Sequence, residues 1–173
     1  MSTDKMTNNT AMAKGAELFT EFMPSPLGRV KVSASQAGIC EIRFITDEEP
    51  TVATPSALTR EAVSQLSRYF AGTLAQFRLP LDATGTVFQQ QVWQQLCQIP
   101  YATTCSYADI ANAIANSKAV RAVGAANGRN PVAIVVPCHR VIGANGTLTG
   151  YAGGLDKKAW LLKHEQRHQA LSG

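Results

Sequence analysis

The chain has 173 residues, of which 45% are hydrophobic, and a formal net charge of +4. This length is enough for one compact core or for a small domain that packs on a larger one. No apolar run approaches the roughly 20 residues that cross a bilayer, and residues 1–15 lack the apolar segment of a secretory signal. We therefore expect a cytoplasmic protein that is not bound to a membrane and has a polar, disordered tail over residues 1–15.

Three apolar segments, at 18–22, 30–32 and 39–45, are separated by residues typical of turns, and they predict a small antiparallel sheet. Residues 46–57 are polar and predict a loop. A helix that ends at Gly72 should follow, because its apolar residues recur at helical spacing. These residues are Ala62, Val63, Leu66, Tyr69 and Phe70.

Residues 75–81 have the composition of a further strand, and residues 82–85 resemble a domain boundary. Thr86 and Gln89 then form a capping-box pattern that predicts a helix ending at Ile99 and Pro100. One face of that helix is apolar. It comprises Phe88, Val92, Trp93 and Leu96.

Two short helices follow, one that begins at Ser106 with Asp109 three residues on, and one over residues 118–127 that stops at Gly128. A tight turn between two short helices is typical of a helix-turn-helix motif. A last helix is expected from Asp156 to about residue 169. The fold class is therefore α+β, with an N-terminal α/β domain over 16–82 and a mostly helical C-terminal domain over 86–170.

The helix over 118–127 is rich in alanine and contains Gly124, so much of its surface carries almost no side chain. Small residues allow another backbone to approach closely. The approaching group could be a neighbouring helix of the core or a nucleic acid, and the pattern alone leaves both interpretations open. Arg121 is the one long basic residue within the alanine-rich part.

No acidic residue occurs between Asp109 and Asp156. A basic, acid-free region suggests a polyanionic partner, although a packing region that happens to lack acids would look the same. The basic residues of this stretch are Lys118, Arg121, Arg129 and Arg140.

The four cysteines do not form a CxxC pair, and all three histidines lie late in the chain, which argues against a zinc site. Disulfides are not expected in a reducing compartment. Cys40 and Cys97 lie in apolar patterns and are expected to be small buried residues. The other two are Cys105 and Cys138.

Cys138 directly precedes His139 and follows the apolar run 132–136, which is expected to form a buried strand. A thiol attacks as the thiolate, and a neighbouring neutral imidazole can remove its proton directly or through one water. Glu165 on the last helix is a candidate to orient that imidazole. From these residues alone, Cys138 is either a nucleophile or an inert structural thiol.

Several ordered motifs resemble the O6-alkylguanine-DNA alkyltransferase family. They are Asn130-Pro131, Pro137-Cys138-His139-Arg140-Val141, Val120 to Gly124, Gly150 to Gly154, and Trp160 to Glu165. The resemblance is dense over residues 86–166 and looser over the N-terminal part. It implies a suicidal methylated-DNA–protein-cysteine methyltransferase that acts on double-stranded DNA containing alkylated guanine, with O4-alkylthymine as a second candidate substrate.

The resemblance also implies how DNA is bound. The helix over 118–127 would lie in the minor groove, and Arg121 would fill the gap that a flipped nucleotide leaves. Ser106, Gly124 and Ala125 would lie close to the DNA backbone. The protein would bind as a monomer, alone or cooperatively along the DNA.

For the flipped base, the resemblance implies that Tyr107 donates to N3 of guanine. The carbonyls of Cys138 and Val141 would accept from the exocyclic amine, and the backbone N–H of Ala152 would contact O6. Tyr151 would form a pocket wall, and Asn130 would act as a hinge.

Some relatives hold zinc in the N-terminal part, but this chain has only Cys40 there and no histidine, so neither metal nor cofactor is expected. Three alternatives stay open at this point. They are a lesion-binding relative that does not transfer the alkyl group, a cysteine hydrolase or redox protein, and a helix-turn-helix regulator with an inert thiol.

Overall fold

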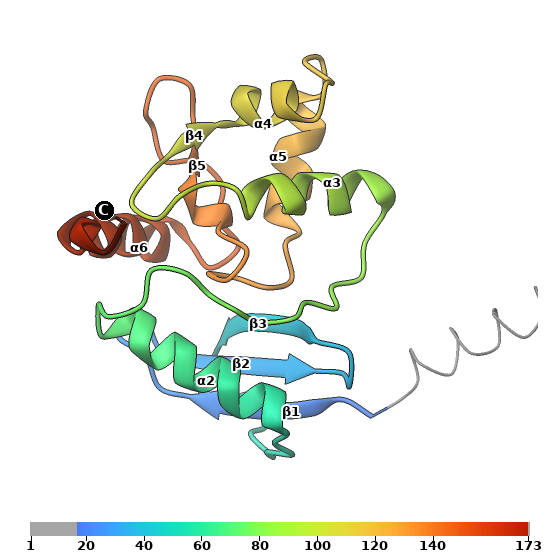
Figure 1. Cartoon of the computed structure of the whole chain (residues 1–173), viewed down its shortest axis with the longest axis vertical. Helices are drawn as coiled ribbons and strands as arrows, with labels where there is room; N and C mark the ends of the chain where they lie inside the picture. Colours follow the sequence, from blue (N-terminus) through green and yellow to red (C-terminus); the bar gives the residue numbers. More distant parts are fainter. Residues whose placement is uncertain (1–16, 173) are drawn as a thin grey trace, which may run out of the picture.

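The computed structural model describes residues 17–172 and is α+β (Figure 1). Residues 1–15, expected to be a disordered tail, lie outside the described part. The N-terminal half is an antiparallel sheet of three strands in the order β1 (Phe19–Met23), β2 (Arg29–Ala34) and β3 (Ile39–Ile45), as the sequence predicts. Helix α2 (Ala57–Phe70) packs on this sheet and buries Ala62, Leu66 and Tyr69.

The expected strand over 75–81 is wrong. This segment has no regular structure, and only Leu81 forms an isolated bridge with Ile39. Its apolar residues pack against the core without forming a ladder, because the edge of β3 is shared with another part of the chain. On that edge, the N–H of Ile42 donates to the carbonyl of Pro131 (2.9 Å), and the N–H of Ala133 donates to the carbonyl of Ile42 (3.0 Å).

The C-terminal half contains α3 (Val87–Leu96), α4 (Tyr107–Ala113), α5 (Val120–Gly128) and α6 (Leu155–Arg167). Thr86 caps α3 with the predicted capping box, and Ser106 caps α4 with a second one, in which Asp109 is the partner. Helix α3 ends three residues before the predicted Ile99, and α5 begins two residues later than predicted. Two-residue strands β4 (Cys105–Ser106) and β5 (Val141–Ile142), which the sequence does not predict, pair in parallel.

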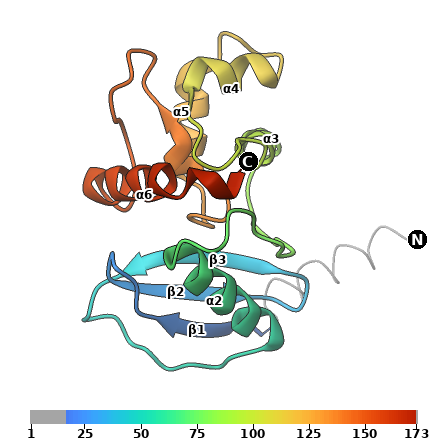
Figure 2. The same cartoon turned by 60° about the vertical axis from the view of Figure 1, so that its left-hand side comes forward.

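Helix α6 lies between the N-terminal sheet and α4 in the view of Figure 2, with α3 beside its C-terminal end. It thus reaches both halves, and its buried residues include Lys158, Leu161, His164 and Glu165. Within residues 17–172, no helix combines the length and the hydrophobicity that a membrane span requires.

Candidate active site

Cys138 begins a short 3-10 helix, η1 (Cys138–Arg140), at the end of a tight turn. The strand expected over 132–136 is wrong, because Ile134 has a φ of +72° and the N–H of Val136 donates to the carbonyl of Val132 (3.0 Å). An apolar run indicates burial but cannot distinguish a strand from a buried turn. The turn leaves Cys138 only 6% exposed.

Asn130 braces this turn from the end of α5. Its Nδ2 donates to the carbonyl of Val136 (2.8 Å), and its Oδ1 accepts from the N–H of Val132 (3.0 Å). Burial raises the pKa of the Cys138 thiol, while a hydrogen bond from Asn130 and the charge of Lys158 oppose that rise. The thiol is therefore protonated at rest and needs a base to become a nucleophile.

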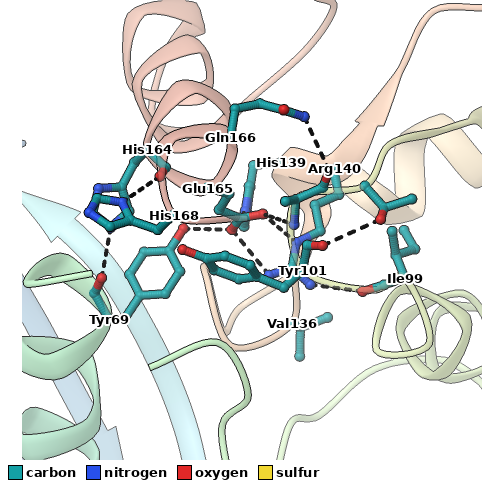
Figure 3. Close-up of polar contacts among 12 residues, drawn as sticks. Tyr69, Ile99, Tyr101, Val136, His139, Arg140, His164, Glu165, Gln166 and His168 are labelled. Carbon is teal, nitrogen blue, oxygen red and sulfur yellow. Dashed lines mark hydrogen bonds and ion pairs between the residues drawn. The ribbon is translucent and has the colours of Figure 1, made fainter. Parts of the chain in front are cut away.

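His139 lies fully buried beside the cysteine, with its Nε2 at 2.6 Å from Oε2 of Glu165 (Figure 3). An ionised carboxylate only accepts hydrogen bonds, so Nε2 carries the proton of a neutral imidazole and Nδ1 presents its lone pair. Nδ1 has no hydrogen-bond partner among the described residues. Burial lowers the pKa of His139, although Glu165 opposes the shift. The site thus contains a neutral imidazole with one unused acceptor.

Glu165 is completely buried, and both of its oxygens have several donors. Oε1 accepts from Nε of Arg140 (2.8 Å) and from the N–H of Ala102 (3.2 Å), while Oε2 accepts from a second guanidinium nitrogen (3.1 Å) as well as from His139. Burial raises the pKa of the Glu165 carboxyl, but the hydrogen bonds from His139 and the guanidinium of Arg140 outweigh it and hold that pKa far below its usual range. Glu165 is ionised throughout the working range.

Arg140 was counted above with the basic residues that could face a polyanion, and that interpretation is wrong. The residue is only 6% exposed, and its guanidinium pairs with Glu165 and donates to the carbonyl of Ile99 (2.8 Å). A charge so fully neutralised contributes little to a surface field. Lys118, Arg121 and Arg129 are exposed.

We predict that acidification destabilises the protein partly through Glu165. An unfolded glutamate titrates near about pH 4.3, whereas the folded-state pKa of Glu165 is lowered. Its stabilisation is fully present above the unfolded value and is lost as the pH falls through the folded value, by up to about 1.4 kcal/mol per pH unit. Urea unfolding between pH 5 and 3 should show this dependence, and for Glu165→Gln the slope of unfolding free energy against pH should be smaller, by a difference that approaches one bound proton near pH 3. Equal slopes would contradict the assignment.

Lys158 belongs to the site but was missed in the sequence. Its side chain is fully buried, and its Nζ donates to the carbonyls of Val141 and Thr149, each at 2.6 Å. It therefore ties both ends of the 141–149 loop to α6. The signal that could have found it is spacing, because Lys158, Leu161 and Glu165 are three and four residues apart and share one face of α6.

A cavity of about 280 Å³ opens at Cys138. Tyr151 and Ala152, which are expected to contact the substrate, line this cavity together with Arg43 and Phe44 from β3. The N-terminal sheet is thus one wall of the candidate substrate pocket. A larger cavity, of about 590 Å³, lies between the 75–81 segment and the end of α3 and does not include Cys138.

Tyr107 lies at the first turn of α4, next to the cap residue Ser106. Its hydroxyl donates to the carbonyl of Thr149 (3.3 Å) and accepts from Oγ1 of the same residue (3.0 Å). It is not among the residues that line the cavity at Cys138. A substrate contact by Tyr107 therefore requires that the hydroxyl leave Thr149.

The small residues of α5 divide between two environments. Ala122 and Ala125 are exposed together with Arg121, whereas Gly124 is half-buried, and a Cβ placed there would lie 3.8 Å from the ring of Tyr107. Ala126 is buried and accepts a hydrogen bond from the indole of Trp93 (2.9 Å). One side of α5 packs in the core, and the other presents a nearly bare surface.

Cys40 and Cys97 were both expected to be buried, and that expectation is wrong. Cys97 is exposed at the end of α3, where a helix end leaves the side chain on the surface, and Cys40 and Cys105 are half-buried. Over residues 17–172, no group of three or more His, Cys, Asp and Glu side chains is arranged to hold a metal ion.

Fold and site together define a two-part α+β protein with a buried cysteine–histidine–glutamate arrangement beside a helix-turn-helix. Residues 18–83 match the family model described as 6-O-methylguanine DNA methyltransferase, ribonuclease-like domain, and residues 87–167 match the model of the DNA binding domain of the same methyltransferase. The chain belongs to the 6-O-methylguanine DNA methyltransferase family, which confirms the resemblance seen in the motifs.

Several relatives are similar over nearly their whole length. A methylated-DNA–protein-cysteine methyltransferase of Methanosarcina barkeri is 43% identical over 157 residues, which cover 87% of this chain and 99% of the relative. The enzyme of that name from Mycolicibacterium paratuberculosis is 48% identical over 153 residues, covering 86% and 92%. The crystal structure of Mycobacterium tuberculosis O6-methylguanine methyltransferase has a TM-score of 0.80 and 43% identity, covering 88% and 94%. A structure of M. tuberculosis OGT in complex with DNA has a TM-score of 0.79 and 45% identity, covering 86% and 93%.

Proposed function

We propose that this protein is a methylated-DNA–protein-cysteine methyltransferase that removes the alkyl group from O6-alkylguanine in duplex DNA and keeps it on Cys138. The observation that carries the proposal is the buried series Cys138, His139 and Glu165, with a neutral imidazole whose Nδ1 is unused. The names of its relatives support this activity, and the DNA complex of the similar M. tuberculosis OGT supports DNA as the molecule that is bound.

The reaction needs one proton transfer and one displacement. His139 takes the thiol proton of Cys138 on Nδ1, directly or through a water, and the imidazolium is stabilised by Glu165. The thiolate then attacks the alkyl carbon, so that the S–C bond forms while the C–O6 bond breaks and its electron pair passes to guanine. Tyr107 donates to N3 and makes the purine a better leaving group.

The product is a thioether, which neither His139 nor water cleaves. Each molecule therefore acts once, and no cofactor takes part. An alkyltransferase-like lesion binder lacks the nucleophile, whereas in this protein Cys138 is present and lines the cavity.

The base must leave the duplex to reach Cys138, at a cost of a few kcal/mol. The exposed surface of α5, with Ala122 and Ala125, suits a close approach to the minor groove, and Arg121 would occupy the space of the flipped nucleotide. Minor-groove binding discriminates little between sequences, as repair of a lesion in any context requires. Ser106 and Gly124 would lie at the edge of this contact.

In the pocket, the carbonyls of Cys138 and Val141 would accept from the exocyclic amine, the N–H of Ala152 would contact O6, and Tyr151 would form a wall. The Val141 carbonyl already accepts from Lys158 and retains a second lone pair. Lys158 would thereby hold this acceptor in position.

We expect Ala125→Glu to weaken binding to duplex DNA at least tenfold. The substitution puts bulk and a negative charge on the exposed side of α5, where phosphates would approach. Fluorescence anisotropy with a labelled duplex measures the effect. The matched control is Ala57→Glu, an exposed alanine at the start of α2 in the other half. Equal affinities of the two variants would exclude α5 as the DNA-binding helix.

The activity itself is tested with a duplex that contains one O6-methylguanine. After incubation with the protein, nucleoside analysis should find guanine in place of the lesion. Tight binding with the lesion intact would indicate a lesion binder, and no preference for the lesion would contradict both functions.

A further inference from the structure

The N-terminal half contributes a side chain to the carboxylate that orients His139. Tyr69, in the last turn of α2, is fully buried, and its hydroxyl donates to Oε2 of Glu165 at 2.6 Å (Figure 3). Tyr69 and Glu165 are 96 residues apart in the chain. This contact crosses from the N-terminal half to α6 and ends on the oxygen that also binds His139.

We propose that Tyr69 is a positioning residue for the transfer reaction, and that its hydroxyl tunes the basicity of His139 through Oε2 of Glu165. The inference rests on the proposed function, because it assigns to Tyr69 a part in activating Cys138. The hydroxyl does more than fill space, because it donates to the same oxygen that binds the imidazole.

Tyr69 is held at both ends, which makes the contact specific. Its backbone carbonyl accepts from Nε2 of His164 on α6 (2.7 Å). Its ring packs against Phe77, with centroids 5.6 Å apart, and edge-on against Tyr101 at 6.3 Å. Burial and the neighbouring carboxylate raise the pKa of the Tyr69 hydroxyl, so it remains a donor at every working pH.

Three donors share Oε2, because Nη2 of Arg140 (3.1 Å) also reaches it. Tyr69 and His139, each at 2.6 Å, compete for the charge of this oxygen. While Tyr69 donates, less negative charge is available to the imidazolium that forms when His139 takes the thiol proton. Without Tyr69, the imidazolium is better stabilised, and His139 becomes protonated at a higher pH. A protonated His139 cannot accept the thiol proton, so the acid limb of the pH–rate profile should move upward.

Other ionisable groups also lie near this pair and set the background on which Tyr69 acts. Arg140 and Lys158 lower the pKa of His139, while Glu165 raises it. The titratable and charged groups around His139 and Glu165 are Cys138 and Arg140 on η1, Lys158 and His164 on α6, Tyr69 on α2, and Tyr101 and Tyr151 on the loops.

We expect Tyr69→Phe to shift the acid limb of Cys138 alkylation upward by about 0.5 to 1 pH unit. The probe is iodoacetamide, and the rate is read from the mass of the Cys138 peptide of the full chain. The matched control is Tyr101→Phe, which removes a neighbouring buried hydroxyl that has no hydrogen-bond partner among the described residues. Its profile should coincide with that of the unsubstituted protein.

A second variant tests the same idea without removing the hydroxyl. Site-specific 3-fluorotyrosine at position 69 has a more acidic hydroxyl that donates more strongly, so the limb should move to lower pH. Acid limbs for Tyr69→Phe and the fluorinated protein that both coincide with the unsubstituted protein would overturn the inference, whatever the changes in stability. Methyl transfer from O6-methylguanine DNA is measured in parallel. If the unsubstituted protein transfers no methyl group, the proposed function fails, while the iodoacetamide profiles still decide the role of Tyr69.

Discussion

Cys138→Ser should abolish methyl transfer and leave binding to lesion-containing DNA nearly unchanged. A serine hydroxyl is far less acidic than a thiol, and the neutral His139 cannot turn it into a nucleophile strong enough to displace guanine. The two side chains are close in size, so the cavity of about 280 Å³ keeps its shape. Loss of O6-methylguanine from a duplex measures transfer, and anisotropy measures binding.

The matched control is Cys97→Ser. Cys97 is an exposed thiol at the end of α3 and lies outside the cavity at Cys138. This variant should transfer the methyl group as fast as the unsubstituted protein. Residual transfer by Cys138→Ser, or its loss in Cys97→Ser, would mean that another thiol is the acceptor.

Glu165→Gln should reduce both stability and the transfer rate. The amide has one acceptor oxygen in place of two and no charge, which leaves the guanidinium of Arg140 buried without a counter-ion. Breaking a buried pair in this way costs about 3 to 5 kcal/mol of unfolding free energy. The transfer rate should fall by about 100-fold, because His139 loses the group that orients it and stabilises the imidazolium.

Urea unfolding and single-turnover transfer measure the two effects of Glu165→Gln. The stability control is Glu49→Gln, which breaks the ion pair with Arg43 (2.8 Å), where both side chains are about one-third or more exposed. The loss of unfolding free energy in Glu49→Gln should be small, because solvent screens such a pair. An equally small loss in Glu165→Gln would contradict the central position of this carboxylate in the core.

Local patterns in the sequence predicted most of the regular structure. Capping boxes at Thr86 and Ser106 and the helical spacing of α2 depend on residues three or four apart, and all of these elements are present. The prediction of a strand over 132–136 is wrong because burial alone does not distinguish a strand from a turn. The two ends of this turn are held by Asn130 and by the edge of β3. No local pattern reports such distant partners.

The same limit applies to the candidate site. The adjacency of Cys138 and His139 is visible in the sequence, and the family motifs suggested Glu165. The wall formed by Phe44, the buried Lys158 and the hydroxyl of Tyr69 were not foreseen, since each depends on packing between the two halves of the chain. The sequence predicts a site confined to the C-terminal helical domain, whereas in the structure the N-terminal half also contributes residues to it.

The account depends most on Cys138 as a stoichiometric acceptor. The direct measurement is the intact mass of the protein after incubation with a tenfold excess of duplex containing O6-methylguanine, followed by peptide mapping. We predict a gain of one methyl group per molecule, located on Cys138, with no further turnover of the remaining lesion. An unchanged mass, a methyl group on another residue, or repair of more lesions than there are protein molecules would contradict it.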